Sequence, residues 1–401
     1  MLSVEEARAR ILAPLRPCAP ELVSVSDAWG RVLAAPVLAR LTQPPADVSA
    51  MDGYAVRACD AAAGQVLRVI GSAPAGHPFA GQVSAGEAVR IFTGSLVPDG
   101  ADTILLQEDA TLDGTSVAVG ETATLGRHIR RAGQDFTAGT VLLPAGRRLG
   151  ARDIGLAAAA NHPWLTVHRR PRIAILATGD EIVMPGDPIG PGGIVSSNAH
   201  AIAALVRAAG GDPILMPLVT DDLGAIAAAA GQLAGMDMLV TTGGASVGDH
   251  DMVQAGLAER GFALDFWKVA MRPGKPLLAG QIGGTAVLGL PGNPVSALVC
   301  AVLFLLPALD VLGGLPAAVP RTERAVLGAD VAANDARADH LRGSLATDDG
   351  GRLVVTPFPR QDSALLRVLA AADVLILRAP HAAATQMGGA VDIIRLDRLG
   401  L

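Results

Sequence analysis

The sequence predicts an α/β multidomain protein: a doubly wound α/β domain with a β-rich inserted module and a C-terminal small β-barrel. Its 401 residues exceed one ordinary domain of about 100–200 residues. Apolar runs alternate with helical patterns over residues 172–312, which indicates a doubly wound sheet. We assign a helical and linker domain, a β-rich module, an α/β domain and a β-barrel domain to residues 1–40 with 136–170, 41–135, 171–320 and 321–401.

Composition is that of a folded, mildly acidic chain. Half of the residues are hydrophobic, 17% are charged and the formal net charge is −6, which is typical of a globular protein. There is no basic tail and only 3% of the residues are aromatic, so we expect no nucleic-acid partner. Three widely spaced cysteines, Cys18, Cys59 and Cys300, form no disulfide framework or metal spacing, which favours the cytoplasm.

No segment is expected to enter a membrane. Residues 1–15 carry Glu5 and Glu6 and lack an apolar core, so they predict an amphipathic helix rather than a signal peptide. The longest apolar run, Val295–Leu309, is interrupted by Ser296 and Pro307 and is shorter than the ~20 residues of a membrane span. We expect it to form a buried helix.

Further helices and short strands are expected before residue 171. A second helix is expected over Ser26–Ala35, whose first residues can cap it, and an Ala-rich helix over Ile154–Ala160. Strands are expected at Val66–Ile70, Ala88–Phe92, Asp102–Leu106, Ser116–Val119 and Thr140–Leu143. Asp113-Gly114 predicts a hairpin turn. Two polar clusters, residues 49–55 and 93–95, have no evident packing purpose.

Strands and helices are expected to alternate in the α/β domain. The strands are Ile173–Ala177, Ile214–Val219, Met238–Thr241, Leu264–Val269 and Ala286–Leu290. The helices are Ser197–Ala209, Leu223–Ala234, Met252–Arg260 and Val295–Leu312. Strands of the C-terminal barrel are expected at Leu341–Leu345, Leu353–Thr356, Val374–Leu377 and Val391–Arg395. Each α/β strand ends in a polar loop, and ligands of open parallel sheets lie beyond the carboxyl ends of the strands.

The stretch Leu239–Asp251 is the most suggestive of these loops. A buried strand leads into a tight loop with Gly243, Gly244 and Ser246, and a helical pattern begins near Met252. Backbone amides of such a loop and of a helix N-terminus can face an anionic ligand.

Acidic residues gather at the same rim of the sheet. They are Asp180, Glu181, Asp221, Asp222, Asp249 and Asp251. Crowded like charges are costly unless a cation relieves them, and carboxylates suit Mg²⁺, which often accompanies substrate phosphates. Helix capping explains Asp222 and Asp249 as well, because acids favour helix starts, but it explains Glu181 poorly.

Cationic and capping residues complete the rim. Asn293 and Pro294 suit the N-cap and first turn of a helix, which places Ser296 where an anion is favoured. Arg272 and Lys275 would add positive charge; Lys275 is one of only two lysines in the chain. The rim therefore suits a phosphate-bearing or oxyanion substrate together with a divalent metal.

One motif at the rim has a competing interpretation. Residues 244–248 match G-x-S-x-G, the nucleophile elbow of α/β-hydrolases, in a strand–turn–helix context. Asp310 and His340 follow in a permissible order, but they lie in a helix end and in the terminal β domain. The acidic flank would also repel an oxyanion. We therefore disfavour an esterase.

Taken together, the motifs resemble the molybdopterin molybdenumtransferase family, which is related to the E domain of gephyrin. The resemblance spans nearly the whole chain. Its stretches are S-A-M-D-G-Y-A (49–55), F-T-G-S-L-V-P (92–98), Q-E (107–108), R-R-A-G-Q-D (130–135), A-T-G-D-E (177–181), P-G (185–186), S-N (197–198), T-D-D (220–222), T-T-G-G-A-S-V-G-D-H-D (241–251), R-P-G-K-P (272–276) and P-G-N-P-V-S (291–296).

The resemblance implies a reaction and its partners. The family inserts molybdenum from molybdate into adenylylated molybdopterin, releases AMP, needs Mg²⁺ and forms an elongated homodimer. The upstream adenylyltransferase and recipient molybdoenzymes are further possible partners. The family's site lies between the α/β domain of one subunit and the β-rich module of the other.

The resemblance also assigns roles to single residues. Catalytic roles fall on Asp52, Thr93, Glu181, Asp221, Asp251 and Lys275. From their own chemistry, Asp221 and Asp251 are the acids that we expect to bind Mg²⁺. Substrate-binding roles fall on Asp135, Gly243, Gly244, Ser246, Arg272, Pro291, Asn293, Ser296 and Ser363, and on Arg337 or Arg342. Molybdate would be held by Arg272, Lys275 and Ser296 with one of those two arginines.

This sequence departs from the family pattern at three places. Arg272 stands where lysine is usual, Gln361 to Ala364 lack the usual glycines around Ser363, and His340 replaces an aromatic residue. Two alternatives stay open: a non-catalytic molybdopterin-binding or scaffold protein, and a molybdopterin adenylyltransferase.

Overall fold

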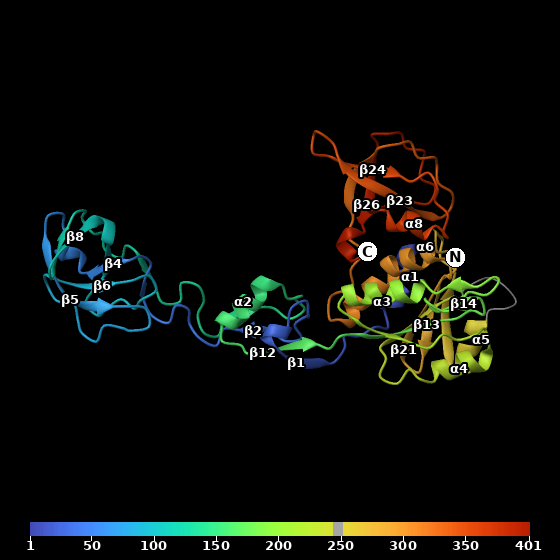
Figure 1. Ribbon diagram of the computed structural model, residues 1–401, viewed down its shortest axis with the longest axis horizontal. Helices are drawn as coiled ribbons and strands as arrows, with labels where there is room; N and C mark the ends of the chain where they lie inside the picture. Colours follow the sequence, from blue (N-terminus) through green and yellow to red (C-terminus); the bar gives the residue numbers. More distant parts are fainter. Residues whose placement is uncertain (244–251) are drawn as a thin grey trace.

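The computed structural model describes residues 1–243 and 252–401 and shows an elongated molecule (Figure 1). A β-rich module forms one end and a small linker region lies in the middle. The α/β domain and the C-terminal domain form the other end, with the C-terminal domain stacked beside the helices. The functional residues predicted in the β-rich module therefore lie far along the molecule from those of the α/β domain.

The distal module is built on a six-stranded sheet. Its strands, in sheet order, are β7 (Thr103–Leu106), β4 (Gly53–Val56), β6 (Glu87–Ile91), β5 (Val66–Ala73), β9 (Ser116–Val119) and β8 (Ala110–Asp113). The predicted hairpin at Asp113-Gly114 is confirmed, because Asp113 pairs with Ser116 and Gly114 has φ +56°. Strands β3 (Val48–Ser49) and β10 (Ile129–Arg130) form a separate antiparallel pair.

The linker region consists of two small strand pairs and a helix. Strand β1 (Pro20–Ser24) pairs with β12 (Trp164–His168), and β2 (Val37–Leu38) pairs with β11 (Val141–Leu143). Helix α2 (Ala151–Ala159) confirms the predicted Ala-rich helix.

The predicted helix over Ser26–Ala35 is wrong. Only a 3₁₀ turn, η1 (Val25–Asp27), forms there. Gly30 then adopts φ +74°, and the backbone N–H groups of Leu33 and Ala34 donate to Arg147 and Thr166 instead of to their own chain segment. Long-range pairing therefore overrides the local helical pattern.

The doubly wound α/β domain is confirmed as a six-stranded sheet. Its strands, in sheet order, are β16 (Asp212–Leu215), β13 (Arg172–Ala177), β17 (Met238–Thr242), β21 (Thr285–Leu290), β20 (Leu278–Ile282) and β18 (Phe262–Trp267). The first four are parallel, while β20 runs antiparallel to both neighbours. Strand β20 was not predicted, since its small residues give no alternating pattern.

Helices cover both faces of this sheet (Figure 1). They are α3 (Asn198–Ala208), α4 (Leu223–Ala230), α5 (Met252–Ala258), α6 (Pro294–Cys300) and α7 (Leu306–Leu312). A π-helical turn, η4 (Ala301–Leu305), joins α6 to α7, so the helix is continuous from Pro294 to Leu312. This segment is apolar and long enough to cross a membrane, but 83% of it is buried inside the protein, as predicted. Helix α1 (Val4–Leu12) packs against it.

The predicted C-terminal barrel is confirmed. Its strands are β22 (Glu323–Leu327), β23 (Ala338–Thr347), β24 (Leu353–Pro357), β25 (Val374–Arg378) and β26 (Ala390–Arg395), and it carries helix α8 (Leu366–Ala370). Strand β23 pairs with both β24 and β25, which closes the sheet into a five-stranded barrel. The short strand β19 (Met271–Arg272), from the α/β domain, adds to β23 in parallel. This pairing ties a loop of the α/β domain directly to the barrel.

Candidate active site at the junction of the α/β domain and the barrel

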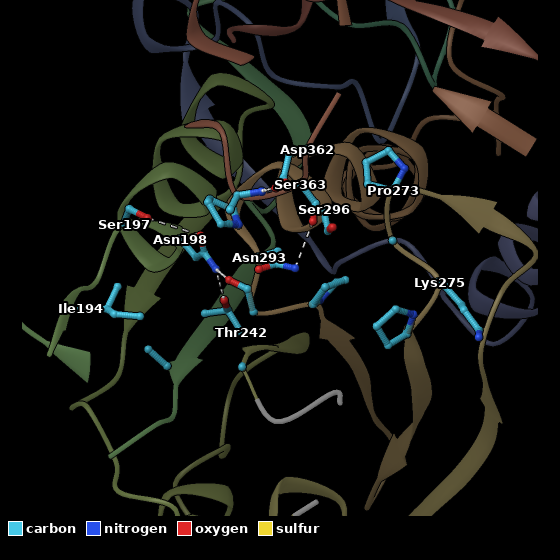
Figure 2. Close-up of a pocket in the computed structure, with 18 of the residues that line it drawn as sticks. Ile194, Ser197, Asn198, Thr242, Pro273, Lys275, Asn293, Ser296, Asp362 and Ser363 are labelled. Atoms are coloured by element: carbon cyan, nitrogen blue, oxygen red, sulfur yellow. Dashed lines mark hydrogen bonds between the residues drawn. The ribbon is translucent and has the colours of Figure 1, made fainter. Parts of the chain in front are cut away.

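A cavity of about 820 Å³ lies where the carboxyl ends of β13, β17 and β21 meet the C-terminal barrel. It gathers many of the predicted site residues. Those that line it are Glu181, Gly243, Arg272, Lys275, Pro291, Asn293, Ser296, Arg337 and Ser363. Figure 2 shows Ser296, Asn293 and Ser363 close together, with Lys275 across the cavity from Ser197 and Asn198. Segments separated by almost 200 residues thus form one polar cavity.

The amino end of α6 is one wall of the cavity. Pro294 occupies the first turn of the helix, as predicted, and Asn293 is the N-cap residue. The side chain of Asn293 does not cap the helix; its Nδ2 donates to the Ser363 Oγ at 3.1 Å (Figure 2). The Val295 N–H donates to the Ser363 carbonyl at 3.1 Å. The barrel's 361–364 loop therefore closes this helix end, and Ser296 is only 5% exposed beside it.

Asn198, at the start of α3, organises the opposite wall. Its Nδ2 donates to the Thr242 Oγ1 at 2.9 Å and to the Gly292 carbonyl at 2.7 Å (Figure 2). It thereby ties the ends of β17 and β21 to α3. Our prediction of site residues missed Asn198 and Thr242, although Ser197-Asn198 is one of the stretches that resemble the family.

Two glycines allow the close packing of the cavity floor. Gly243 has φ +101°, and a Cβ at this position would lie 2.5 Å from the Thr178 carbonyl oxygen. Gly179 has φ +145°, and a Cβ there would lie 2.7 Å from a carboxylate oxygen of Glu181. The absence of side chains lets Glu181 lie back against the loop while still lining the cavity.

The three cations of the cavity differ in what they contact. The guanidinium of Arg272 is held by Asp339 and Asp335, and that of Arg337 by Asp335 at 3.0 Å. The hydrogen bonds that Arg272 donates to the Asp339 carboxylate raise the pKa of Arg272, although partial burial opposes this. Within the described residues, the ammonium of Lys275 has no hydrogen-bond or ion-pair partner. Lys275 is therefore the cation best placed to meet an anionic ligand.

Of the two arginines offered by the barrel, Arg337 lines the cavity and Arg342 does not. Arg342 is 1% exposed and donates to the carbonyls of His340 and Asp362. Burial lowers the pKa of its guanidinium. Arg342 supports the 361–364 loop from beneath rather than facing the cavity.

The predicted residues of the distal module form a separate cluster. The Asp52 Oδ1 accepts from the Thr93 N–H at 2.7 Å and from the Thr93 Oγ1 at 2.9 Å. These two hydrogen bonds lower the pKa of Asp52. Arg90 lies over the rings of Tyr54 and Phe92, at 5.1 and 4.9 Å from their centroids, and donates to the Gly53 carbonyl.

The distal cluster and the cavity do not meet within one chain. Asp52 and Thr93 belong to the end of the molecule opposite the cavity (Figure 1). Asp135, the third residue predicted in this part of the chain, is exposed in the segment that leads back to the linker region. The contribution of all three to the cavity stays a prediction.

The acidic rim is only partly described. Asp222 is the N-cap of α4 and accepts from the Ala225 N–H at 2.8 Å, in agreement with the capping interpretation. Next to it, the Asp221 N–H donates to Asp180 at 3.1 Å. The predicted residues Gly244, Ser246 and Asp251 lie outside the described residues.

The predicted metal site includes Asp251 and is therefore only partly within the described residues. Residues 1–243 and 252–401 contain no group of three or more His, Cys, Asp or Glu side chains arranged to hold a metal. A site of one or two carboxylates completed by water and substrate phosphates is the usual arrangement for Mg²⁺. Asp221 at the rim fits such a site as one of its carboxylates.

The positions of Asp310 and His340 do not support the esterase alternative. Asp310 lies near the end of α7 and pairs with Arg148 of the linker region at 2.9 Å. His340 is 5% exposed inside the barrel wall, where burial lowers its pKa to about 4. Neither lines the cavity at the strand ends.

The fold and the cavity define a multidomain α/β protein with a polar, cation-bearing site between its sheet and a β-barrel. Three family models match consecutive parts of the chain: the MoeA N-terminal region (domain I and II) at residues 2–161, a probable molybdopterin binding domain at 174–311, and the MoeA C-terminal region (domain IV) at 324–396. Together with relatives that carry the family's name at 41% and 32% identity, these matches show that the chain belongs to the molybdopterin molybdenumtransferase family.

Relatives and solved structures agree with this assignment. A molybdopterin molybdenumtransferase of Nostoc sp. is 41% identical over 74% of this chain and 70% of its own length. Molybdopterin molybdenumtransferase 1 of Mycobacterium tuberculosis is 32% identical over the whole of both chains. The crystal structure of a molybdopterin biosynthesis MoeA protein from Pyrococcus horikoshii matches with a TM-score of 0.86 at 28% identity, covering 98% of this chain and 99% of that chain.

Proposed function

We propose that this protein inserts molybdenum from molybdate into adenylylated molybdopterin, with release of AMP, to give the molybdenum cofactor. Family membership supports the class of reaction. The observation that carries the proposal is the cavity, which is lined by Lys275, a cation without a partner within the described residues, and by Ser296, Asn293 and Ser363. Such a cavity suits a tetrahedral oxyanion and a phosphate-bearing substrate.

The residues of the cavity have separable roles in this proposal. Lys275 supplies positive charge to the oxyanion, and the hydroxyls of Ser296 and Ser363 can donate to its oxygens. Asn198 holds the strand-end loops at a fixed separation, which orients the pterin substrate. Glu181 also lines the cavity, and its carboxylate can position a substrate N–H or a water.

We infer further that the working unit is a homodimer. Asp52 and Thr93 are linked to each other but lie at the far end of the elongated chain from the cavity (Figure 1). A second copy could bring its distal cluster to the cavity, which explains why exposed polar residues of the distal module share the family's pattern. Each dimer would then hold two sites.

We also infer a requirement for Mg²⁺. Asp221, together with Asp251, would hold the ion at the acidic rim. Bound there, Mg²⁺ would neutralise charge on the substrate phosphates.

The remaining partners follow from the reaction. Its substrate must come from an enzyme that adenylylates molybdopterin, and its product must pass to molybdoenzymes that lack their cofactor. Three cysteines without disulfides fit action in the cytoplasm.

AMP release tests the proposal. Purified protein is incubated with adenylylated molybdopterin, molybdate and Mg²⁺, and AMP and active molybdenum cofactor are measured over time. We expect both products to accumulate together, and the active cofactor only when molybdate is present. If the substrate is bound but neither AMP nor active cofactor forms, the protein is a molybdopterin-binding protein without this activity.

A further inference from the structure

The loop that carries Lys275 is fixed at its base. The Lys268 N–H donates to the Leu277 carbonyl at 3.2 Å, and the Val269 N–H donates to the Lys275 carbonyl at 3.0 Å. On its outer side, the Ala270 N–H donates to the Leu2 carbonyl at 2.8 Å. The N-terminal segment therefore holds one flank of this loop, which we call the lysine loop (residues 268–277).

The barrel holds the other flank. The strand pair β19–β23 sets Arg272 opposite Asp339, and the Ala338 N–H donates to the Ala270 carbonyl at 2.9 Å. Asp339 is itself only 7% exposed, so its carboxylate stays in place. The register of one short strand pair thus brings a cation of the lysine loop against a buried anion of the barrel.

Most N–H donors of the Arg272 guanidinium are hydrogen-bonded to residues of the barrel. Its Nε donates to the Asp339 Oδ1 at 2.9 Å and its Nη2 to the Asp339 Oδ2, which is a bidentate pair. Its Nη1 donates to Asp335 at 3.3 Å and its Nη2 also to the Asn334 Oδ1 at 3.3 Å. Asn334 is anchored in turn by the Arg337 and Ala379 carbonyls at 2.7 and 2.9 Å. Little donor capacity is left for an anion in the cavity.

A third contact presses the lysine loop onto α6. Gly274 has φ +105°, and a Cβ there would lie 2.4 Å from the Sγ of Cys300, which is fully buried in that helix. The backbone on both sides of Lys275 is therefore held by the N-terminal segment, the barrel and α6. Only the Lys275 side chain is left without a partner in the part of the chain that the structure describes.

We propose that Arg272 and Asp339 form a strut that positions Lys275, and that Arg272 is not itself a ligand of the oxyanion. Asp339 is then a positioning residue, acting on the substrate through Arg272 and the lysine loop. The strut requires arginine, because a lysine ammonium is a point charge that cannot form the bidentate pair. The effect on turnover rests on the proposed function, whereas the effect on the loop does not.

Kinetics of three variants test the strut. Arg272→Gln and Asp339→Asn each remove one partner, and a double variant removes both. We expect each single change to raise the KM for molybdate by about ten- to a hundredfold, since small misplacements in a site cost factors of this size. The double variant should be no worse than either single variant, because one strut can be lost only once. The KM for adenylylated molybdopterin should change less than the KM for molybdate.

A matched pair on the same barrel serves as the control. Asp392 pairs with Arg324 at 3.2 Å on the barrel surface, and neither residue lines the cavity. Asp392→Asn should leave the KM for molybdate unchanged. Arg272→Lys, which keeps the charge but not the bidentate geometry, should fall between wild type and Arg272→Gln.

Opposite results would overturn the strut. If Arg272 were an anion ligand muted by Asp339, then Asp339→Asn would lower the KM for molybdate while Arg272→Gln raised it. Additive effects in the double variant would also contradict a shared role.

Hydrogen exchange separates this inference from the proposed function. Amide exchange in residues 268–277 should be faster in Arg272→Gln and Asp339→Asn than in wild type and Asp392→Asn. This result is expected whether or not wild-type protein releases AMP. Unchanged exchange in both variants would show that no strut exists, even in an active enzyme.

Discussion

The cavity and the distal cluster represent two different ways of placing polar side chains. In the cavity, Asn198, Asn293 and Arg272 donate to carbonyl, hydroxyl or carboxylate oxygens on other elements, while Lys275 has no partner within the described residues. In the distal cluster, the carboxylate of the half-buried Asp52 accepts hydrogen bonds from Thr93, and within the described residues no other side chain binds it. The polar side chains of the cavity are thus held in place within one chain, whereas those of the distal cluster resemble residues that a second subunit would cover.

The largest expected effect concerns Lys275 in the cavity. Lys275→Ala removes the cation that has no partner among the described residues, so AMP release in the presence of molybdate should fall by about a hundred- to a thousandfold. Lys268→Ala is the matched control, because Lys268 lies 3.8 Å over the ring of Trp267 and does not line the cavity. Comparable losses in both variants would mean that the effect is not specific to the cavity.

The next effect asks whether the two regions work together across subunits. Asp52→Asn and Lys275→Ala should each be nearly inactive as homodimers. A mixed dimer, purified through two different affinity tags, should regain about half of the wild-type rate, since one of its two sites is then intact. A mixed dimer as inactive as its parents would place Asp52 outside the partner's site.

A smaller effect distinguishes the two ends of the molecule by pH. Burial lowers the pKa of His340 to about 4, so the unfolded chain binds a proton more readily than the folded barrel between pH 6.5 and 4. Stability of the barrel should therefore fall by about 1–3 kcal/mol as pH decreases through this window. His340→Phe should flatten this dependence in thermal unfolding, while His77→Gln in the distal module should not. A curve unchanged by His340→Phe would contradict this assignment.

The smallest expected effect concerns the pKa of Asp52 in the distal cluster. The pKa of Asp52 is lowered first by the Thr93 N–H and then by its hydroxyl. Thr93→Ala keeps the first bond and loses the second, so the pKa of Asp52 should rise partway and the acid limb of the pH–rate profile should move to higher pH. Thr93→Ser keeps a hydroxyl and should leave the limb in place. If wild type, Thr93→Ala and Thr93→Ser gave identical pH–rate profiles, the ionisation of Asp52 would not control the rate.

Local sequence pattern determined much of this protein. Apolar runs ending in Gly and Asp predicted the strands of the doubly wound sheet, and Asn293-Pro294 predicted where α6 begins. These features depend on neighbours in the chain, through side-chain periodicity and backbone capping. Because parallel strands share one carboxyl edge, the same pattern also predicted that Glu181, Gly243, Lys275 and Ser296 would gather there.

Tertiary structure decided what those residues can do. The register of β19 on β23 places Arg272 where it pairs with Asp339 and Asp335. Arg342 is buried beneath a loop. The elongated fold separates Asp52 from the cavity of the same chain. Pairing with Arg147 and Thr166 likewise replaced the helix expected at Ser26–Ala35. Each outcome depends on contacts between segments far apart in the chain, and local propensity carries no information about which distant partner a side chain will meet.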